Sequence, residues 1–313
     1  MLFMVSGFVY YNTPHTTPSP QNSVIKEPSQ IDLLNRPAIK PVATSGRLIL
    51  NRMDAYPHDV IGHSVKNREI RAYRFGTGDR KIIFVGALHG GYVWNTALLA
   101  YQLIDFYSLA PELVPSDLQL IVIPVANPDG LHEAVGSWER FNFLDAPQFE
   151  LATEIGPQDV AYDSRFNANK VDLNRNFDCN RNGKTAGWRQ YVVDAGPTAF
   201  SEPESIALRD FFLQEVPKAV VFYNSASNGV YPSSCNSDPL PGTLDLQAQY
   251  SAASGYPSYK SYPYYDITGD AADWLSTKDI PAITVELSNH SSIEWEKNLW
   301  GIDALIAFYS DVK

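Results

Sequence analysis

Cysteine is scarce in this chain: its 313 residues include only Cys179 and Cys235. Two cysteines exclude a disulfide-rich scaffold and any metal site built from four thiolates. They suffice for one disulfide, but the sequence does not show whether their Cα atoms come close enough to bond. Their pairing therefore stays open at this point.

Positive charge is also in short supply. Lys and Arg total 24 against 35 Asp and Glu, which gives a formal net charge of −11 at pH 7. An acidic chain without a long Lys/Arg cluster is poorly suited to bind a phosphate backbone. We therefore expect no nucleic-acid partner.

Apolar runs long enough to cross a bilayer, about 20 residues, are missing. Residues 1–11 (MLFMVSGFVYY) are apolar but too short, and they lack the positive start of a secretory signal. A stretch rich in Pro, Ser, Thr and Gln follows, which is typical of an extended linker. We assign residues 1–45 to this stub and linker and residues 46–313 to a folded domain. A clipped signal or anchor would explain the stub and imply export to the periplasm, the cell surface or the medium. A disordered tail explains it equally well, and we expect membrane contact only through such an anchor.

Hydrophobic residues are abundant, at 44%, so a full core is expected. Lys81–Leu88 and Leu118–Val125 are nearly continuous apolar runs, typical of strands buried on both faces. The helical pattern of Trp94–Leu109 lies between them, so the two strands are predicted to be parallel. Ala219–Tyr223 and Ala282–Leu287 predict further buried strands. These elements indicate one α/β domain with a mixed sheet.

Two more helices are predicted over Ser201–Val216 and Ser291–Val312. Ser201 and Glu204 stand three residues apart at the start of the first, a spacing that predicts a capping box. The chain has no internal repeat and no second shift in composition, so we expect a single folded domain and a monomer.

Polar residues stand at four predicted strand ends: His89, Asn127–Asp129, Asn224 and Glu286. Ligands of open α/β sheets bind beyond the carboxyl ends of the strands. Glu286 interrupts an otherwise apolar strand, where a lone buried carboxylate is costly. It either pairs with an arginine or projects into a cleft as a general base, and we favour the second interpretation.

The segment Arg165–Phe177 (RFNANKVDLNRNF) is dense in Arg and Asn. A guanidinium offers a fork of donors that matches the two oxygens of a carboxylate, so such a segment suits carboxylate recognition. A polar loop that satisfies its own backbone is the alternative, and it would be preferred if the segment stood alone.

Six segments, in order, carry a family resemblance: GALHGGYVWN, NPDGL, RFNANKVDLNRNF, SEPES, YYDITGDAADWL and PAITVELSN. Together they resemble the zinc carboxypeptidase family, the carboxypeptidase A-like metallocarboxypeptidases, from about Ala55 to the C-terminus. The resemblance implies a three-layer α/β/α sandwich around an eight-stranded, mixed and mostly parallel sheet.

The resemblance implies roles for five residues of this chain. Arg165, Asn174 and Arg175 match the residues that bind a substrate's terminal carboxylate and polarise its scissile carbonyl. Tyr265 matches the mobile tyrosine that closes over the substrate, and Glu286 matches the general base. The predicted catalytic residues are thus Glu286 and Arg165, and the predicted ligand is the C-terminus of a peptide.

Ala272 falls near the position that sets side-chain specificity in this family. A neutral residue there argues weakly against a basic C-terminal residue in the ligand. Asp270 and Asp273 are close enough in sequence to undermine that inference.

The family's zinc ligands are only partly matched. The resemblance places them at a His-x-x-Glu pair and a later His, whereas this chain has His89, Tyr92 and Asn224 at those positions. A catalytic zinc site needs three protein ligands and a water. A phenol titrates near 10 and a carboxamide is a poor zinc donor, so His89 is the only retained ligand. His290 is expected to be a solvated loop histidine rather than a replacement ligand.

The cofactor is therefore zinc if the site functions, and otherwise none. Zinc lowers the pKa of its bound water from ~15.7 to about 7, and without it hydrolysis should be orders of magnitude slower. We expect a carboxypeptidase-like protein that binds peptide C-termini with little or no cleavage. Two alternatives remain: an active carboxypeptidase with an unorthodox zinc site, acting on peptides such as those of cell walls, and a non-catalytic partner-binding domain.

Overall fold

The computed structural model describes residues 56–146, 160–181, 185–188 and 191–311. The stub and linker expected over residues 1–45 lie outside these ranges, so the boundary of the folded domain stays a prediction. None of the described helices combines the length and the apolarity that crossing a bilayer requires.

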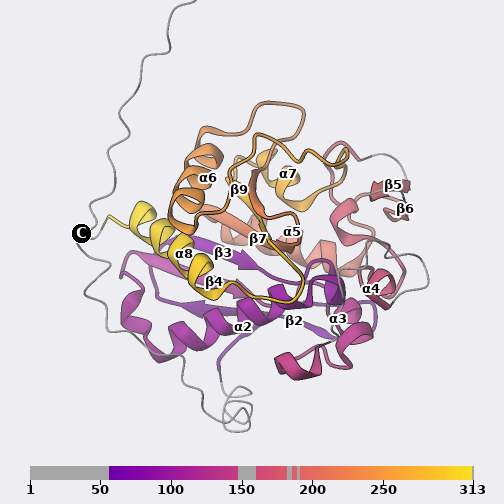
Figure 1. The fold of residues 1–313 in the computed structure, drawn as a ribbon, viewed down its shortest axis with the longest axis horizontal. Coiled ribbons are helices and arrows are strands. Elements are labelled where there is room, and N and C mark those ends of the chain that lie inside the picture. The colour runs from indigo at the N-terminus through magenta and orange to yellow at the C-terminus, as the bar shows by residue number, and fades with distance from the viewer. Residues whose placement is uncertain (1–55, 147–159, 182–184, 189–190, 312–313) are drawn as a thin grey trace, which may run out of the picture. The chain divides into compact units, whose positions relative to one another are not determined.

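One mixed sheet organises the domain (Figure 1). In spatial order its described strands are β1 (Asp59–His63), β2 (Glu69–Phe75), β4 (Leu118–Ile123), β3 (Arg80–Val85), β7 (Ala219–Ser225), β9 (Ala282–Leu287) and β8 (Gly229–Pro232). The central four, β4, β3, β7 and β9, pair in parallel, while β1, β2 and β8 pair antiparallel at the edges. The predicted mixed, mostly parallel sheet is confirmed, with seven strands in the described residues where the resemblance implied eight.

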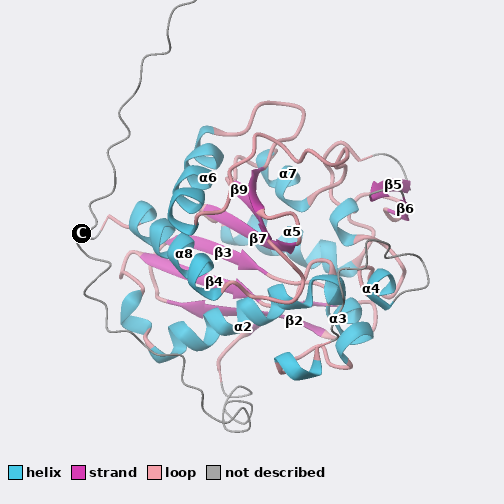
Figure 2. Cartoon of the chain, in the orientation of Figure 1, coloured by secondary structure: helices cyan, strands magenta, loops and turns pink. Residues whose placement is uncertain are grey.

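Helices cover both faces of the sheet, as a buried parallel centre requires (Figure 2). Against one face pack α2 (Trp94–Leu109), α6 (Pro241–Ser254) and α8 (Trp295–Tyr309), and against the other α5 (Pro203–Glu215) and α7 (Ala271–Ser276). Side chains along β3 alternate between the layers: Ile82 and Phe84 join the first, Ile83 and Val85 the second. The three-layer α/β/α sandwich is confirmed.

Shorter elements lie near the carboxyl end of β3 and in the connections. They are α3 (Pro128–Val135), α4 (Val160–Asp163), the hairpin of β5 (Thr185–Trp188) and β6 (Tyr191–Asp194), and 3₁₀ turns at Gly90–Val93, Pro111–Leu113, Phe143–Asp145 and Leu173–Arg175. A third, small apolar cluster that includes Tyr92, Phe166 and Trp188 holds several of them together.

The start of α5 differs from the prediction. Its N-cap is Glu202, followed by Pro203 in the first helical turn, where the missing N–H of proline costs no helical hydrogen bond. The Ser201 Oγ accepts from Asn176 Nδ2 at 2.9 Å, and Glu204 accepts from Asn167 Nδ2 at 3.1 Å. The predicted capping box is therefore wrong, because both of its side chains have tertiary partners.

The two cysteines are paired. Cys179 and Cys235 form a disulfide with their Cα atoms 5.8 Å apart, across 56 residues of sequence. Cys179 follows the Leu173–Arg175 turn, and Cys235 lies just beyond β8. The bond therefore ties together two segments that are distant in the chain.

Candidate functional site

Three predicted site residues meet at the carboxyl ends of neighbouring parallel strands. His89 follows β3, Asn224 lies near the end of β7, and Glu286 lies near the end of β9. The register of β7 and β9 sets Asn224 directly opposite Glu286. The sheet thus gathers these side chains at the edge where α/β proteins bind ligands.

A cavity of about 330 Å³ opens at this edge. The sequence-predicted residues that line it are His89, Asn174, Arg175, Asn224, Tyr265, Ala272 and Glu286. Ser233, Asp270 and Asp273 line it as well, whereas Arg165 and Tyr92 do not. Most of the predicted site is therefore in one place.

Two residues at the strand ends belong elsewhere. Asn127 caps α3 by accepting from the Gly130 amide at 2.9 Å. Asp129 accepts from the Ser64 hydroxyl at 2.9 Å and from the Lys66 amide at 3.0 Å. Both have structural roles, and neither lines the cavity.

Backbone carbonyls orient the Arg175 guanidinium, which is buried at 2% exposure. Its Nε donates to Gly187 O at 3.1 Å, and its Nη1 donates to Asn174 O at 2.7 Å. A guanidinium carries five N–H donors, so others remain for a ligand in the cavity. The ring of Tyr265 lies 5.8 Å from the guanidinium carbon.

The Asn174 amide is held from both ends. Its Oδ1 accepts from the Ala271 amide at 2.9 Å, and its Nδ2 donates to Asp270 Oδ2 at 2.6 Å. One N–H of the Nδ2 group is thereby used and the second is left for a ligand. Asp270 thus positions Asn174, a role the sequence analysis missed.

Gly269 allows the two loops of this side of the cavity to approach. Its φ is +68°, and a Cβ there would lie 2.2 Å from the carbonyl oxygen of Arg175. Its own carbonyl accepts from Phe177 N at 3.0 Å. Both the positive φ and the close approach require glycine.

His89 is buried and neutral at pH 7. Burial, together with the Arg165 charge, lowers its pKa to about 4. Its Nδ1 lies 3.4 Å from Oδ1 of Asp172, whose other oxygen accepts from Arg165 Nε at 2.8 Å. Although burial opposes it, Arg165 and His89 hold the pKa of Asp172 well below its usual range. Asp172 was overlooked despite its place inside the Arg165–Phe177 segment.

Arg165 and Tyr92 form part of an aromatic cluster rather than the cavity wall. The Arg165 guanidinium carbon lies 4.4 Å from the centre of the Trp188 ring and 5.6 Å from that of Tyr92. Tyr92 meets Trp188 edge-on at 5.2 Å and His290 at 4.6 Å. Such contacts stabilise the rings by dispersion and quadrupole attraction.

His290 is not the solvated loop histidine we expected. It is 5% exposed, and its Nδ1 lies 3.0 Å from the Ser225 hydroxyl. The prediction was wrong because the loop after β9 folds back over the end of β7 and the Tyr92 ring.

Glu286 projects into the cavity and pairs with neutral groups. Its Oε1 accepts from Asn224 Nδ2 at 2.7 Å, and its Oε2 accepts from the Ser227 amide at 3.2 Å. Burial raises its pKa to about 7, against the lowering effect of these two hydrogen bonds. A carboxyl group with such a pKa is suited to proton transfer near neutral pH.

The residues at the family's zinc positions do not fit the metal. The Asn224 amide nitrogen is directed to Glu286, and Tyr92 packs into the aromatic cluster. Within the described ranges no group of three His, Cys, Asp or Glu side chains could hold a metal ion. Tetrahedral zinc sites in proteins use such donors, so His89 stands alone.

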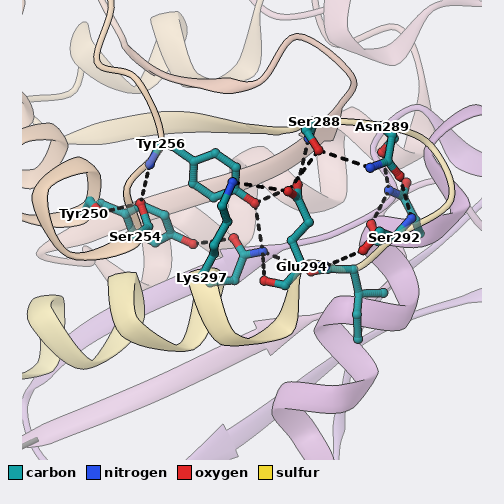
Figure 3. A network of polar contacts seen from close by, with 11 residues as sticks. Tyr250, Ser254, Tyr256, Ser288, Asn289, Ser292, Glu294 and Lys297 are labelled. Carbon is teal, nitrogen blue, oxygen red and sulfur yellow. Dashed lines mark hydrogen bonds and ion pairs between the residues drawn. The ribbon is translucent and has the colours of Figure 1, made fainter.

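A polar network fixes the loop that follows Glu286 (Figure 3). Glu294 accepts from Ser288 N at 2.7 Å and from the Tyr256 hydroxyl at 2.9 Å. Nearer the cavity, Asn95 Nδ2 donates to the carbonyls of Asn289 and Ser292 at 2.8 and 2.9 Å. The end of β9 and its side chains are thereby held against α2 and α8.

The mixed sheet, its two helical layers and the cavity at the ends of β3, β7 and β9 define a metallocarboxypeptidase-type fold. The sequence model of the zinc carboxypeptidase family matches residues 51–299, and the chain belongs to this family.

Solved structures agree with the fold. Murein-tripeptide amidase MpaA from Escherichia coli O157 superposes with a TM-score of 0.57 at 22% identity, over 82% of this chain and 95% of that chain. Carboxypeptidase A from Helicoverpa armigera gives 0.57 at 20% identity, over 84% and 71%. Bovine thrombin-activatable fibrinolysis inhibitor gives 0.59 at 17%, over 84% and 91%.

A curated relative matches only locally. Over 83 residues, 24% of this chain, the sequence is 35% identical to bacteriocin BCN5 of Clostridium perfringens. The match spans 9% of the length of that protein.

Proposed function

We propose that this protein binds the C-terminal carboxylate of a peptide in its cavity and does not hydrolyse the peptide by the zinc-dependent route of its family. One observation carries the proposal: Arg175 and Asn174 keep donors toward the cavity, while Asn224 donates its amide to Glu286. Arg175 and Asn174 thus retain hydrogen-bond donors for a carboxylate, whereas the Asn224 amide N–H is used by Glu286.

The binding step follows from the geometry of the donors. The guanidinium of Arg175 is oriented by two carbonyls, so little side-chain entropy is lost when it meets a carboxylate. Asn174 adds an amide N–H, and Tyr265 lies beside the guanidinium at the cavity wall. Charge-assisted hydrogen bonds of this kind contribute about 1.5–3 kcal/mol each.

The hydrolytic step lacks an activated nucleophile. Glu286 has a pKa suited to a general base, but it would have to deprotonate an ordinary water of pKa ~15.7 rather than a metal-bound one near 7. Arg165 does not line the cavity, and Asp172 and Trp188 hold its guanidinium. The missing metal-bound water and the position of Arg165 both raise the activation free energy of peptide hydrolysis.

The alternatives are weaker. An unorthodox zinc site would need donors that the described residues do not group together. A partner-binding domain with a vestigial cleft would not need Arg175 and Glu286 to be built so completely into the cavity wall.

We also propose that the protein is exported. Disulfides form and persist mainly in oxidising compartments, and Cys179 is bonded to Cys235. Finding the protein with this bond in the periplasm or the medium of the producing cell would support export. A reduced pair in cytosolic fractions would contradict it.

Calorimetry with two otherwise identical peptides, one ending in a free carboxylate and one in an amide, tests the function. We expect the free acid to bind at least about tenfold more tightly. Arg175→Ala should remove this difference, whereas Arg209→Ala, on α5 away from the cavity, should preserve it.

Two outcomes would contradict the proposal. Equal affinity for acid and amide would exclude carboxylate recognition. Release of the C-terminal residue at rates typical of enzymes (about 1–1,000 per second), abolished by a chelator and restored by zinc, would show that the zinc-dependent route operates.

A further inference from the structure

The disulfide joins two segments that both contribute to the cavity wall. The first segment, residues 176–181, contains Cys179, and the second, residues 233–236, contains Cys235. Residues of both segments line the cavity. In the part of the chain that the structure describes, no hydrogen bond or ion pair runs between the two segments. The S–S bond is therefore their direct connection.

Backbone hydrogen bonds connect the first segment to the loop before α7. The Gly269 amide donates to Cys179 O at 2.7 Å, and the Phe177 amide donates to Gly269 O at 3.0 Å. Gly269 is followed by Asp270, whose carboxylate accepts from Asn174 Nδ2 at 2.6 Å. The position of Cys179 is thereby coupled to that of Asn174, one of the two residues proposed to bind a peptide carboxylate.

The second segment is attached to α7 and to the sheet. The Ser234 amide donates to Asp273 Oδ1, in the first turn of α7, at 2.8 Å. The Ser233 amide donates to Ala282 O at the start of β9 at 3.1 Å. The disulfide, the bonds of Gly269 and the bond from Ser234 to Asp273 therefore form a closed circuit through the first segment, the start of α7 and the second segment. Breaking the disulfide opens this circuit and lets its parts move more independently.

The two cysteines differ in their exposure. Cys179 is 2% exposed and belongs to the apolar cluster under α5 and α7, whereas Cys235 is partly exposed at the rim of that cluster. Thiol–disulfide exchange requires an attacking thiolate to reach one of the two sulfurs. Cys235 is therefore the cysteine at which a reductant in solution attacks, and Cys179 is the one whose sulfur leaves.

We propose that this disulfide is a redox switch for peptide binding: the oxidised protein holds Arg175 and Asn174 in place for a carboxylate, and reduction weakens binding without unfolding the domain. This inference rests on the proposed function. A dithiol reductant supplies two electrons and two protons, its own sulfurs form a disulfide, and Cys179 and Cys235 become thiols. The freed segments must then be ordered again when a peptide binds, which lowers the affinity. Binding is thereby confined to oxidising compartments.

Calorimetry on the full chain tests the switch with the same pair of peptides, one ending in a free carboxylate and one in an amide. We expect the acid to bind about tenfold more weakly after treatment with dithiothreitol, while far-UV circular dichroism shows that the fold is retained. Affinity for the amide should change by less than about twofold. Replacing both cysteines by serine should give the weaker affinity with and without reductant, which separates loss of the bond from any effect of the reductant itself.

Thermodynamic linkage supplies a second test that needs no variant. If reduction weakens binding of the acid about tenfold, a saturating concentration of the acid must make reduction about tenfold less favourable, which lowers the reduction potential of the disulfide by about 30 mV. Equilibration in a series of redox buffers, followed by alkylation of the free thiols and mass spectrometry, measures this potential. The peptide amide at the same concentration is the matched control and should leave the potential unchanged.

The outcomes separate the switch from the proposed function. If oxidised and reduced protein bind the acid equally and the potential does not shift, the switch is wrong and carboxylate recognition stands. If reduction abolishes the circular dichroism signal, the switch is also wrong, because binding is then lost together with the fold. If the oxidised protein does not distinguish the acid from the amide, both proposals fall.

Discussion

The two sides of the cavity treat their polar side chains differently. On the carboxylate side, Arg175 and Asn174 are oriented by backbone groups and by Asp270, and they keep donors toward the cavity. On the metal side, Asn224 donates its amide N–H to Glu286, and Tyr92 packs against Trp188. On the first side the donors are held in place by the chain, and on the second an amide N–H and an aromatic ring are engaged by neighbouring side chains.

On the proposed function, this difference means that binding and bond cleavage are separable in this fold. The residues proposed to hold a peptide end lie on the turn Leu173–Arg175 and on the loop before α7, whereas the positions implied as metal ligands lie after β3 and near the end of β7. Changes at two strand ends can therefore remove the chemistry and leave the recognition loops intact.

The largest effect is expected from the bond that braces the carboxylate side. Replacing Cys179 and Cys235 by serine should lower the free energy of unfolding by roughly 4 kcal/mol, because the bond closes a loop of 56 residues. Urea titration of the double variant, with parent protein treated with a reductant as the matched control, measures the loss. Coincident unfolding curves of the double variant and the untreated parent would mean that the disulfide contributes nothing to stability.

A smaller effect should come from Glu286 on the metal side. Its folded pKa of about 7 lies above the ordinary value of 4.5, so the folded state binds the proton more tightly. Its stabilising contribution is complete below pH 4.5 and is lost as the pH rises to 7, by about 3 kcal/mol at most.

Glu286→Gln should therefore flatten the fall in unfolding free energy between pH 4.5 and 7. Glu133→Gln, at an exposed position of α3, should leave that slope as in the parent. If the unfolding free energy of Glu286→Gln falls with pH as steeply as that of the parent, the pKa of Glu286 is not raised by burial.

Restoring zinc-binding side chains at residues 92 and 224 would test the difference between the two sides directly. Tyr92→Glu combined with Asn224→His would offer two donors beside His89, and zinc affinity should rise by at least about tenfold, or 1.4 kcal/mol. Competition with a chelating dye, checked by elemental analysis, measures it, with each single variant as a control. Equal zinc affinities of the parent and the double variant would show that Tyr92 and Asn224 are not what prevents zinc binding.

The smallest effect is expected from metal removal in the parent protein. A strong chelator should change neither its thermal midpoint nor its affinity for a peptide acid, the latter by less than about twofold. A drop in either quantity, reversed by added zinc, would revive the unorthodox metal site.

The sequence predicted the fold well because apolar runs report burial directly. Lys81–Leu88 and Leu118–Val125 had to be internal strands, and a crossover helix between them had to make them parallel. The ends of such strands meet at one sheet edge, so the gathering of His89 and Glu286 followed as well.

Contacts between distant segments could not be predicted in the same way. The bond between Asn224 and Glu286 depends on the register of two strands far apart in sequence, which no local pattern encodes. The burial of His290 depends on the path of the loop after β9. Bonds from Asn176 to Ser201 and from Asn167 to Glu204 likewise replaced the local capping box predicted for this helix start.

The hydrogen bond between Asn224 and Glu286 bears on how the folded yield of the protein depends on zinc. Where a bound ion is part of the native state, the folded fraction varies with the free concentration of that ion. The Asn224 amide that bonds Glu286 is part of the chain, so its presence does not depend on the concentration of any ion. On the proposed function, we therefore expect a zinc-starved cell to make this protein in the same folded yield as a zinc-replete one.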